Sequence, residues 1–341
     1  MTVQTADNPG ARVSEGRVGV LLVNLGTPQA PTRPAVRDYL AEFLSDRRIV
    51  DYPRAIWLPV LYGIILNTRP AKTARAYAKI WRNDTGESPL RYYTRRQAER
   101  LGGKLGGTVV VDWAMRYGSP SIAERINAMN AAGVTRILIV ALYPQYSSTT
   151  TASVNDAVFD AVKGMRLQPT LRFTPPFAAE PAYIDALAAS ARLALAGMRE
   201  PPECVILSFH GLPERLTAAG DPYASECRMT AERLRAAMGW SERFAPLAYQ
   251  SKFGPEPWLG PATDDLIAAS AQNGVKRIAV ITPGFVADCI ETLEEIAIAG
   301  KEGFMGAGGS QFAAIPCLND SDEMIRLLET LVRRELKGWI D

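Results

Sequence analysis

An internal repeat constrains the fold of this chain more than any other sequence feature. Residues 132–140 (AGVTRILIV) resemble residues 273–281 (NGVKRIAVI), and each segment runs from a glycine into an apolar strand pattern. Two further pairs occur in the same order, residues 20–28 with 205–213 and residues 115–118 with 251–254. A helix-to-strand junction of this kind also recurs by chance, but three collinear matches indicate two similar halves.

Each half alternates near-continuous apolar strands with helical patterns, which is typical of parallel sheets covered on both faces. The matched pairs lie 185 residues apart at the first strand and 141 residues apart at the later one, so the first half carries about 44 more residues. We assign this insertion to residues 36–80. The predicted fold is α/β, with two similar lobes, each a parallel four-stranded sheet with helices on both faces, and a cleft between them.

The expected boundaries follow from this repeat. Residues 1–16 are a polar tail without the apolar core of a signal peptide. The lobes are expected at residues 17–170 and 171–317, and residues 318–341 are expected to form a helix that packs back on the first lobe. Helices are predicted at residues 119–131, with Ser119 as the N-cap, and at 181–197, 225–238, 261–273 and 321–338.

The composition excludes several classes of protein. Thirty-eight basic residues oppose 36 acidic ones, and a net charge of +2 is too balanced for a nucleic-acid binder. The apolar fraction of 47% excludes wholesale disorder. The four cysteines form no C-x-x-C pair, which argues against a zinc ribbon and against a dense disulfide scaffold. We therefore expect a reduced, intracellular protein of the size of an enzyme.

Nucleotide-binding motifs are missing from the sequence positions where they would be expected. No G-x-G-x-x-G follows the first strand, and the glycine-rich residues 102–107 precede a strand instead of following one. The chain contains no G-x-x-x-x-G-K-[ST] sequence. Ligands of open parallel sheets bind outside the carboxyl ends of the strands. This crevice is therefore expected to hold something other than a nucleotide.

The longest apolar stretch covers residues 56–66 and lies inside the predicted insertion. Eleven residues cannot span a bilayer, which needs about 20, and Pro59 and Gly63 predict a poor long helix. The segment is either a core helix or an exposed lip that touches a membrane surface or covers an apolar ligand. The residues that would form this lip are Ile56, Trp57, Leu58, Leu61 and Tyr62.

The chain has one histidine, His210, which directly follows an apolar strand. Because an imidazole can accept a proton near neutral pH, His210 is a candidate base at the crevice. The alternative is a histidine that only caps the following loop.

An acidic segment follows another strand, at residues 283–295. If a helix starts near Asp288, then Asp288, Glu291 and Glu295 share one face, beside the thiol of Cys289. Such a row suits a divalent cation. The alternative for Asp288 and Glu291 is a capping box, which needs no function.

Two further loops carry unusual residues. Five consecutive hydroxyl side chains at residues 147–151 predict either an anion site or a run of helix caps. Residues 249–261 contain Tyr249, Trp258 and three prolines, which predicts a rigid wall for a flat apolar ligand or a pinned surface loop.

Five segments together resemble the ferrochelatase family, from about residue 17 to 338. They are VNLGTP (23–28), YPQYSSTTTAS (143–153), LSFHGLP (207–213), YQSKFGPEPWLGPATDD (249–265) and PGFVADCIETLEEIA (283–297). The resemblance implies two Rossmann-like lobes around a cleft, one with an inserted lip. It also implies insertion of Fe²⁺ into protoporphyrin IX with release of two protons, the terminal step of haem biosynthesis, catalysed by a lyase.

The resemblance also implies roles for individual residues. His210 and Glu291 match the catalytic pair, and Asp288 and Glu295 would extend it as further metal-handling groups. The side from which iron enters stays open. The expected porphyrin-binding residues are Met115, Arg116, Tyr117, Ser88 and Phe285, together with Trp258 and Tyr249 of the aromatic wall.

Two departures from other family members matter. Cys289 stands where some relatives have a second histidine, so a mechanism with two imidazoles is not expected. Some relatives hold a [2Fe–2S] cluster through cysteines near the C-terminus, but the last cysteine here is Cys317, and no cluster is expected. Fe²⁺ is then a substrate, and no cofactor is required.

The expected partners are protoporphyrin IX and ferrous iron, not nucleic acid. We expect a cytoplasmic monomer or homodimer that makes peripheral contact with the cytoplasmic membrane. The alternatives are a tetrapyrrole carrier without turnover, and a related chelatase for another metal or tetrapyrrole, such as Co²⁺ or coproporphyrin.

Overall fold

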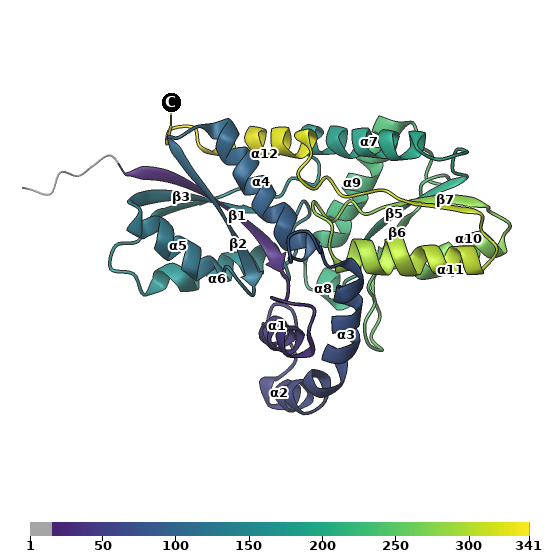
Figure 1. The fold of residues 1–341 in the computed structure, drawn as a ribbon, viewed down its shortest axis with the longest axis horizontal. Helices are drawn as coiled ribbons and strands as arrows, with labels where there is room; N and C mark the ends of the chain where they lie inside the picture. Colours follow the sequence, from purple (N-terminus) through teal and green to yellow (C-terminus); the bar gives the residue numbers. More distant parts are fainter. Residues whose placement is uncertain (1–15, 341) are drawn as a thin grey trace, which may run out of the picture.

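The computed structural model describes residues 16–340 and contains two parallel sheets with the same strand order (Figure 1). The first sheet has the order β2-β1-β3-β4, and the second has the order β6-β5-β7-β8. Their bounds are β1 (Arg17–Gly26), β2 (Val109–Tyr117), β3 (Val134–Ala141), β4 (Thr170–Phe173), β5 (Cys204–His210), β6 (Leu247–Gln250), β7 (Arg277–Ile281) and β8 (Gln311–Ala314). The predicted pair of four-stranded Rossmann-like lobes is confirmed.

The repeated segments form equivalent strands in the two sheets. Residues 20–28 and 205–213 cover the central strands β1 and β5, and residues 132–140 and 273–281 cover their neighbours β3 and β7. One expected boundary is wrong, because position 170/171 falls within β4, which pairs with β3 of the first sheet. The expected polar tail lies outside the described residues except for its last residue.

Helices alternate with the strands in both lobes. Their bounds are α4 (Pro89–Leu105), α5 (Ile122–Ala131), α6 (Thr151–Lys163), α7 (Pro181–Ala196), α8 (Glu214–Ala218), α9 (Tyr223–Met238), α10 (Thr263–Gln272), the π-helix η2 (Glu291–Gly300), α11 (Lys301–Gly306) and α12 (Asp322–Glu335). The helix predicted at residues 119–131 begins later than expected. Its N-cap is Ser121, which forms a capping box with Glu124, and not Ser119.

One face of each sheet packs on a hydrophobic core that the two sheets share. Helices α5 and α6 cover one face of the first sheet, and α10 and η2 cover one face of the second. The opposite faces share a single cluster that includes Leu22 of β1, Phe209 of β5, Leu101 of α4, Leu187 of α7, Leu234 of α9 and Leu328 of α12. Helix α12 packs on α4 and β3 of the first lobe and also on α7 (Figure 1). The two lobes are therefore held together by buried apolar surface.

The insertion between β1 and α4 is helical. It comprises α1 (Arg33–Ser45), α2 (Arg54–Val60), the π-helix η1 (Leu61–Ile65) and α3 (Leu66–Ile80), which project from the sheets (Figure 1). Pro59 and Gly63 were expected to make a poor long helix, and the chain stays helical from residue 54 to 80 only with a change from α to π geometry. The irregularity is taken up by the π-turns that contain Gly63.

Candidate active site

The loops that follow β3 and β7 meet where the two lobes join. Gln145, which follows β3, is buried and donates from Nε2 to the carbonyl oxygen of Pro283 at 3.4 Å and to Oγ1 of Thr230 at 2.9 Å. Pro283 lies just beyond the carboxyl end of β7. The carboxyl ends of the strands in both sheets are thus directed toward one another, which is where ligands of parallel sheets bind.

His210 is the last residue of β5 and is half-buried at this junction. Its Nδ1 lies 2.6 Å from the carbonyl oxygen of Gly211. A carbonyl oxygen only accepts, so Nδ1 carries a proton, and in the neutral form of the ring Nε2 has a free lone pair. The backbone oxygen of His210 accepts from Oη of Tyr223 at 3.0 Å. The ring centroid lies 6.4 Å from that of Phe285. The histidine is thereby oriented to accept a proton or bind a metal through Nε2.

Glu291 begins η2, and its carboxylate faces the insertion. Burial raises the pKa of Tyr77, and the negative charge of Glu291 raises it further. The pKa of Tyr39 is also raised, by burial first and then by Tyr77 and Glu291. Tyr39 lies on α1 and Tyr77 on α3, and the neighbouring Leu293 of η2 packs on the same cluster. The insertion therefore covers the start of η2 with buried phenols.

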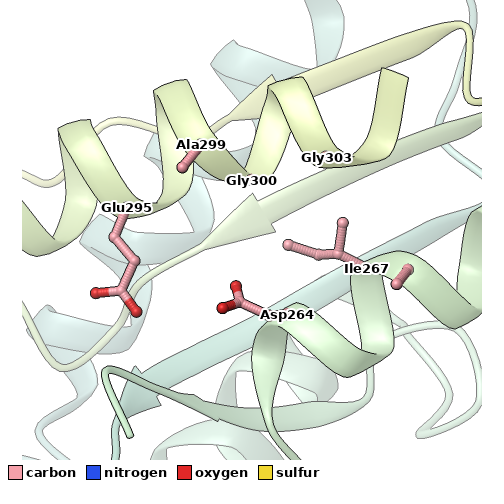
Figure 2. A pocket seen from close by; sticks show the side chains of 7 residues that line it. Asp264, Ile267, Glu295, Ala299, Gly300 and Gly303 are labelled. Carbon is pink, nitrogen blue, oxygen red and sulfur yellow. The ribbon is translucent and has the colours of Figure 1, made fainter. Parts of the chain in front are cut away.

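Glu295 is close to both His210 and Glu291. It accepts hydrogen bonds from the backbone nitrogen of Ser251 at 2.7 Å and from Oγ of Ser251 at 2.6 Å. Burial and the Glu291 carboxylate raise the pKa of Glu295, and they outweigh the lowering by Ser251 and His210. Glu295 and Asp264 also line a cavity of about 180 Å³, and Figure 2 shows both carboxylates directed between the two helices.

Asp288 does not share a helical face with Glu291 and Glu295. Its carboxylate is buried and accepts from Oγ1 of Thr292 at 2.9 Å, from Nδ2 of Asn319 at 2.7 Å and from the backbone nitrogen of Cys317 at 3.3 Å. The helical turn begins at Ile290, and the π-helix that follows does not have 3.6 residues per turn. Neither the shared face nor the capping box is formed, and Asp288 instead holds the loop before η2.

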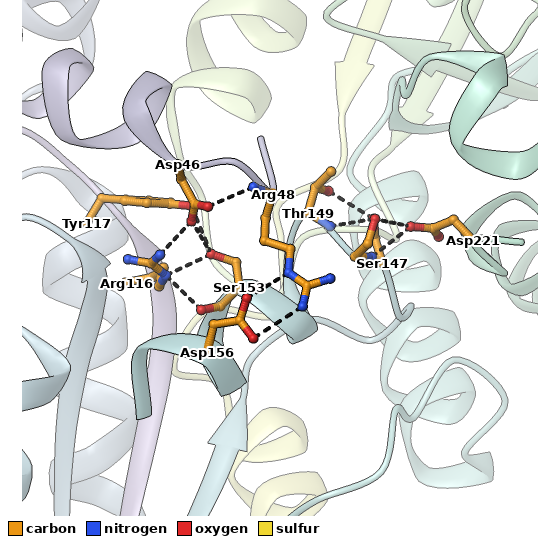
Figure 3. A network of polar contacts seen from close by, with 10 residues as sticks. Asp46, Arg48, Arg116, Tyr117, Ser147, Thr149, Ser153, Asp156 and Asp221 are labelled. Carbon is orange, nitrogen blue, oxygen red and sulfur yellow. Dashed lines mark hydrogen bonds and ion pairs between the residues drawn. The ribbon is translucent and has the colours of Figure 1, made fainter. Parts of the chain in front are cut away.

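Several of the expected porphyrin-binding residues contact other side chains or the backbone of the protein itself. The guanidinium of Arg116 contacts Ser153 and Asp46, and Oη of the fully buried Tyr117 donates to Asp46 at 2.7 Å (Figure 3). Ser88 is buried and caps α4 by accepting from the backbone nitrogen of Arg91 at 3.2 Å.

Three more of these expected porphyrin contacts pack against other parts of the protein. Met115 and Tyr249 belong to the core shared by the two sheets. Trp258 pairs with Pro213 and lies against Gly211, the residue after His210. Of the expected porphyrin contacts, Phe285 is the one beside His210.

The hydroxyl-rich loop at residues 147–151 binds a carboxylate of the chain itself. Oδ2 of Asp221, which precedes α9, accepts from Oγ of Ser147 at 3.0 Å and from the backbone nitrogen and Oγ of Ser148 at 2.7 Å each. The loop thus joins the first lobe to the second through Asp221 (Figure 3). Among residues 16–340, no three His, Cys, Asp or Glu side chains converge to hold a metal ion.

Four residues near Glu291 and Glu295 were not among those expected at the site: Tyr39, Tyr77, Gln250 and Ser251. Gln250 is the last residue of β6, the strand equivalent to β2 in the repeat, and Ser251 follows it directly. Their place at a strand end was the sequence signal that could have identified them. The two tyrosines carry no such signal, because only the tertiary structure brings the insertion over η2.

Comparison with known proteins is consistent with this geometry. The sequence profile of the ferrochelatase family matches residues 17–336. The chain belongs to the ferrochelatase family. It is 54% identical to the ferrochelatase of Rhizobium meliloti, over 96% of this chain and 97% of that protein. It is 53% identical to that of Allorhizobium ampelinum, over 96% of each chain, and 50% identical to that of Brucella ovis, over 99% of this chain and 96% of the relative.

Solved structures support the fold of this ferrochelatase-family chain. SirB from Bacillus subtilis with Fe³⁺ has a TM-score of 0.57 at 9% identity, covering 95% of this chain and 99% of that one. The sirohydrochlorin chelatase SirB from Bacillus subtilis subspecies spizizenii in complex with cobalt has a TM-score of 0.55 at 10% identity, covering 94% and 96%. At this identity, the similarity establishes the shared two-lobed architecture.

Proposed function

We propose that this protein inserts ferrous iron into protoporphyrin IX and releases two protons, forming protohaem in the terminal step of haem biosynthesis. The observation that carries the proposal is His210 with its free Nε2 beside Glu295 and Glu291, in a chain that matches the ferrochelatase family over residues 17–336. In each turnover Fe²⁺ enters as a reactant and leaves within the haem product, so iron is a substrate here and not a resident metal.

In this proposal, His210 is the base that accepts pyrrole protons. Nε2 of the neutral ring takes the proton, and the Nδ1–H···O=C contact to Gly211 stabilises the resulting imidazolium. A planar porphyrin holds its nitrogen lone pairs in the ring plane. Binding between two rigid lobes can bend the ring toward the transition state, with binding energy supplying the strain. Glu291 and Glu295 then provide a row of carboxylates along which cations pass to or from the ring.

Replacement of the single imidazole tests this proposal. We expect His210→Ala to lower the rate of haem formation from protoporphyrin IX and Fe²⁺ by roughly 10²–10⁴-fold, the contribution of a general base. Porphyrin affinity, measured by fluorescence quenching, should change little. Assays with Zn²⁺, Co²⁺ and coproporphyrin in parallel define the substrate preference. Undiminished turnover in His210→Ala would contradict the proposed base, and stoichiometric porphyrin binding without turnover in the wild type would indicate a carrier.

We also propose peripheral contact of the insertion with the cytoplasmic membrane. None of the helices in the described residues is long and apolar enough to cross a membrane. Ile56 is 66% exposed, and Tyr62 and Ile64 are exposed beside it, whereas Trp57 and Leu58 are half-buried and Leu61 is fully buried in the core of the insertion. An exposed lip would thus consist of Ile56, Tyr62 and Ile64, since Leu61 faces inward.

Liposome flotation tests the lip. The triple variant Ile56→Ser, Tyr62→Ser, Ile64→Ser should lose binding to anionic vesicles, because it removes the exposed apolar side chains. Leu193→Ser is the matched control, since Leu193 on α7 is 79% exposed and distant in sequence from the insertion. Equal binding of the triple variant and the wild type would contradict membrane contact through this surface.

We propose further that the reaction requires no iron–sulfur cluster. Cys317, the last cysteine, is buried with its Sγ 3.6 Å from Oγ1 of Thr282, and burial raises its pKa, which disfavours the thiolate that ligates iron. Full activity of protein that lacks visible absorption before substrate is added would support this proposal.

A further inference from the structure

One buried amide side chain joins the strand that carries His210 to the helix that carries Glu291. Gln250, the last residue of β6, is 2% exposed. Its Nε2 donates to the backbone oxygen of Glu291 at 2.8 Å, and its own backbone oxygen accepts from the nitrogen of Gly211 at 2.7 Å. Gly211 follows His210 directly. The same residue thus contacts the main chain at both members of the proposed catalytic pair.

The orientation of the Gln250 amide is fixed by the hydrogen bond that its nitrogen donates and by the one that its oxygen accepts. Oε1 of Gln250 accepts from Oγ of Ser208 at 2.8 Å, and Oγ of Ser208 lies 2.7 Å from Oγ1 of Thr263 on α10. Ser208 and Thr263 are fully buried. Because the Glu291 carbonyl only accepts, the amide cannot flip without losing its bond to Glu291. The chain from Thr263 to Glu291 therefore has one arrangement.

The main chain is tightly packed where Gly211 contacts Gln250. A β-carbon added at Gly211 would lie 2.8 Å from the backbone oxygen of Gln250 and 3.2 Å from Cε3 of Trp258. On the other side, Ser251 adopts a left-handed φ of 65° while its backbone nitrogen donates to Glu295. A left-handed conformation in a residue other than glycine persists when surrounding contacts impose it. The turn after β6 is therefore held tightly between β5 and η2.

We propose that Gln250 is a positioning residue that sets His210 and Glu291 at their working separation. The inference rests on the proposed function, since it concerns the alignment of that catalytic pair. Loss of the Nε2 donor releases the first peptide of η2 from β6, while the core residues of both elements stay packed. Chemistry between aligned groups is sensitive to displacements of about 1 Å, which can cost about 10²-fold in rate.

Gln250→Met tests this inference, because methionine keeps the length and lacks both hydrogen-bonding atoms. We expect kcat for Fe²⁺ insertion to fall roughly 10–100-fold, with KM and the porphyrin Kd within about twofold of wild type. Gln97→Met is the matched control. Gln97 on α4 is also fully buried, and its Nε2 donates to the backbone oxygen of Asn319 at 2.6 Å. This control should lose similar stability and keep kcat.

A second variant and a second readout separate this inference from the proposed function. Ser208→Ala removes the contact that orients the amide and should give a smaller loss of kcat with the same unchanged KM. Hydrogen exchange, which needs no activity, should accelerate at residues 291–295 in Gln250→Met and not in Gln97→Met. Equal kcat in the two methionine variants, or unchanged exchange at 291–295, would overturn the positioning role. Absence of insertion by the wild type would instead overturn the proposed function, while the exchange result still tests the link.

Discussion

Asp46 ties the insertion to the first sheet through one carboxylate. Its Oδ2 accepts from Oη of Tyr117 and from Oγ of Ser153, each at 2.7 Å, and pairs with the guanidinium of Arg116 (Figure 3). Burial raises the pKa of Asp46, but the hydrogen bonds from Ser153, the backbone of Arg48 and Tyr117 outweigh it and leave the pKa below its ordinary value. A carboxyl whose pKa is lowered by folding stabilises the folded state when it is ionised.

The expected stability of Asp46→Asn follows from this sign. At pH 7, the variant should unfold at lower urea concentration, with a loss of about 1–3 kcal/mol for hydrogen bonds to a charged group. The loss should shrink as pH falls from about 4 through the lowered pKa, because the wild-type carboxyl is then protonated too. Asp156→Asn removes an exposed ion pair with Arg48 and should cost under about 1 kcal/mol. A difference that stays constant with pH would contradict this account.

Two helices begin with the same serine cap in different parts of the molecule. Ser88 accepts from the nitrogen of Arg91 at the start of α4, and Ser321 accepts from the nitrogen of Met324 at the start of α12, both at 3.2 Å. Such caps satisfy backbone N–H groups that have no partner within the helix. The local geometry thus explains Ser88 without a ligand, although the family resemblance implies contact with a porphyrin propionate.

A pair of alanine variants distinguishes the two roles of Ser88. Ser88→Ala and Ser321→Ala should each lower the free energy of unfolding by about 1 kcal/mol, since each loses one cap. Both should bind protoporphyrin IX with the affinity of the wild type in a fluorescence titration. A weaker affinity for protoporphyrin IX in Ser88→Ala alone would support contact of Ser88 with a porphyrin propionate.

At the scale of the whole molecule, the lobes share a core and a polar contact. The cluster that packs under both sheets includes residues of β1 and β5. Next to it, Asp221 accepts three hydrogen bonds from the loop of Ser147 and Ser148, and Oε2 of Glu226 accepts from the backbone nitrogen of Tyr146 at 2.7 Å. Lobes joined in this way should not unfold independently.

Calorimetry should therefore show one unfolding transition. Asp221→Ala should lower its midpoint by roughly 2–4 °C without splitting it, because the lost bonds to a charged group stabilise by about 1.5–3 kcal/mol in a cooperative unit of this size. Asp185→Ala, at an exposed position on α7, should leave the midpoint near that of the wild type. Two resolved transitions in the wild type would show that the lobes unfold separately.

The sequence alone was enough for the architecture and for the place of His210 and of the acidic segment in it. Apolar periodicity and the repeat predicted two equivalent parallel sheets, because a strand that is buried on both faces consists of apolar residues almost throughout. They also predicted that His210 and the acidic segment at 283–295 lie at strand ends, where parallel strands expose their loops. The extra length of the first half located the insertion.

Only the tertiary structure decided what most polar side chains do. Arg116 and Asp46 are 70 residues apart, and Asp288 and Asn319 are 31 apart, so no local pattern pairs them. Asp288 is not part of the acidic row, because it lies in the loop before the first helical turn, where Thr292 and Asn319 bind its carboxylate. Burial by elements distant in the chain turned Ser88 and Met115 inward and brought Gln250 to Glu291. Periodicity reports which face of an element is covered, but the partner that covers it is set by how the elements pack together.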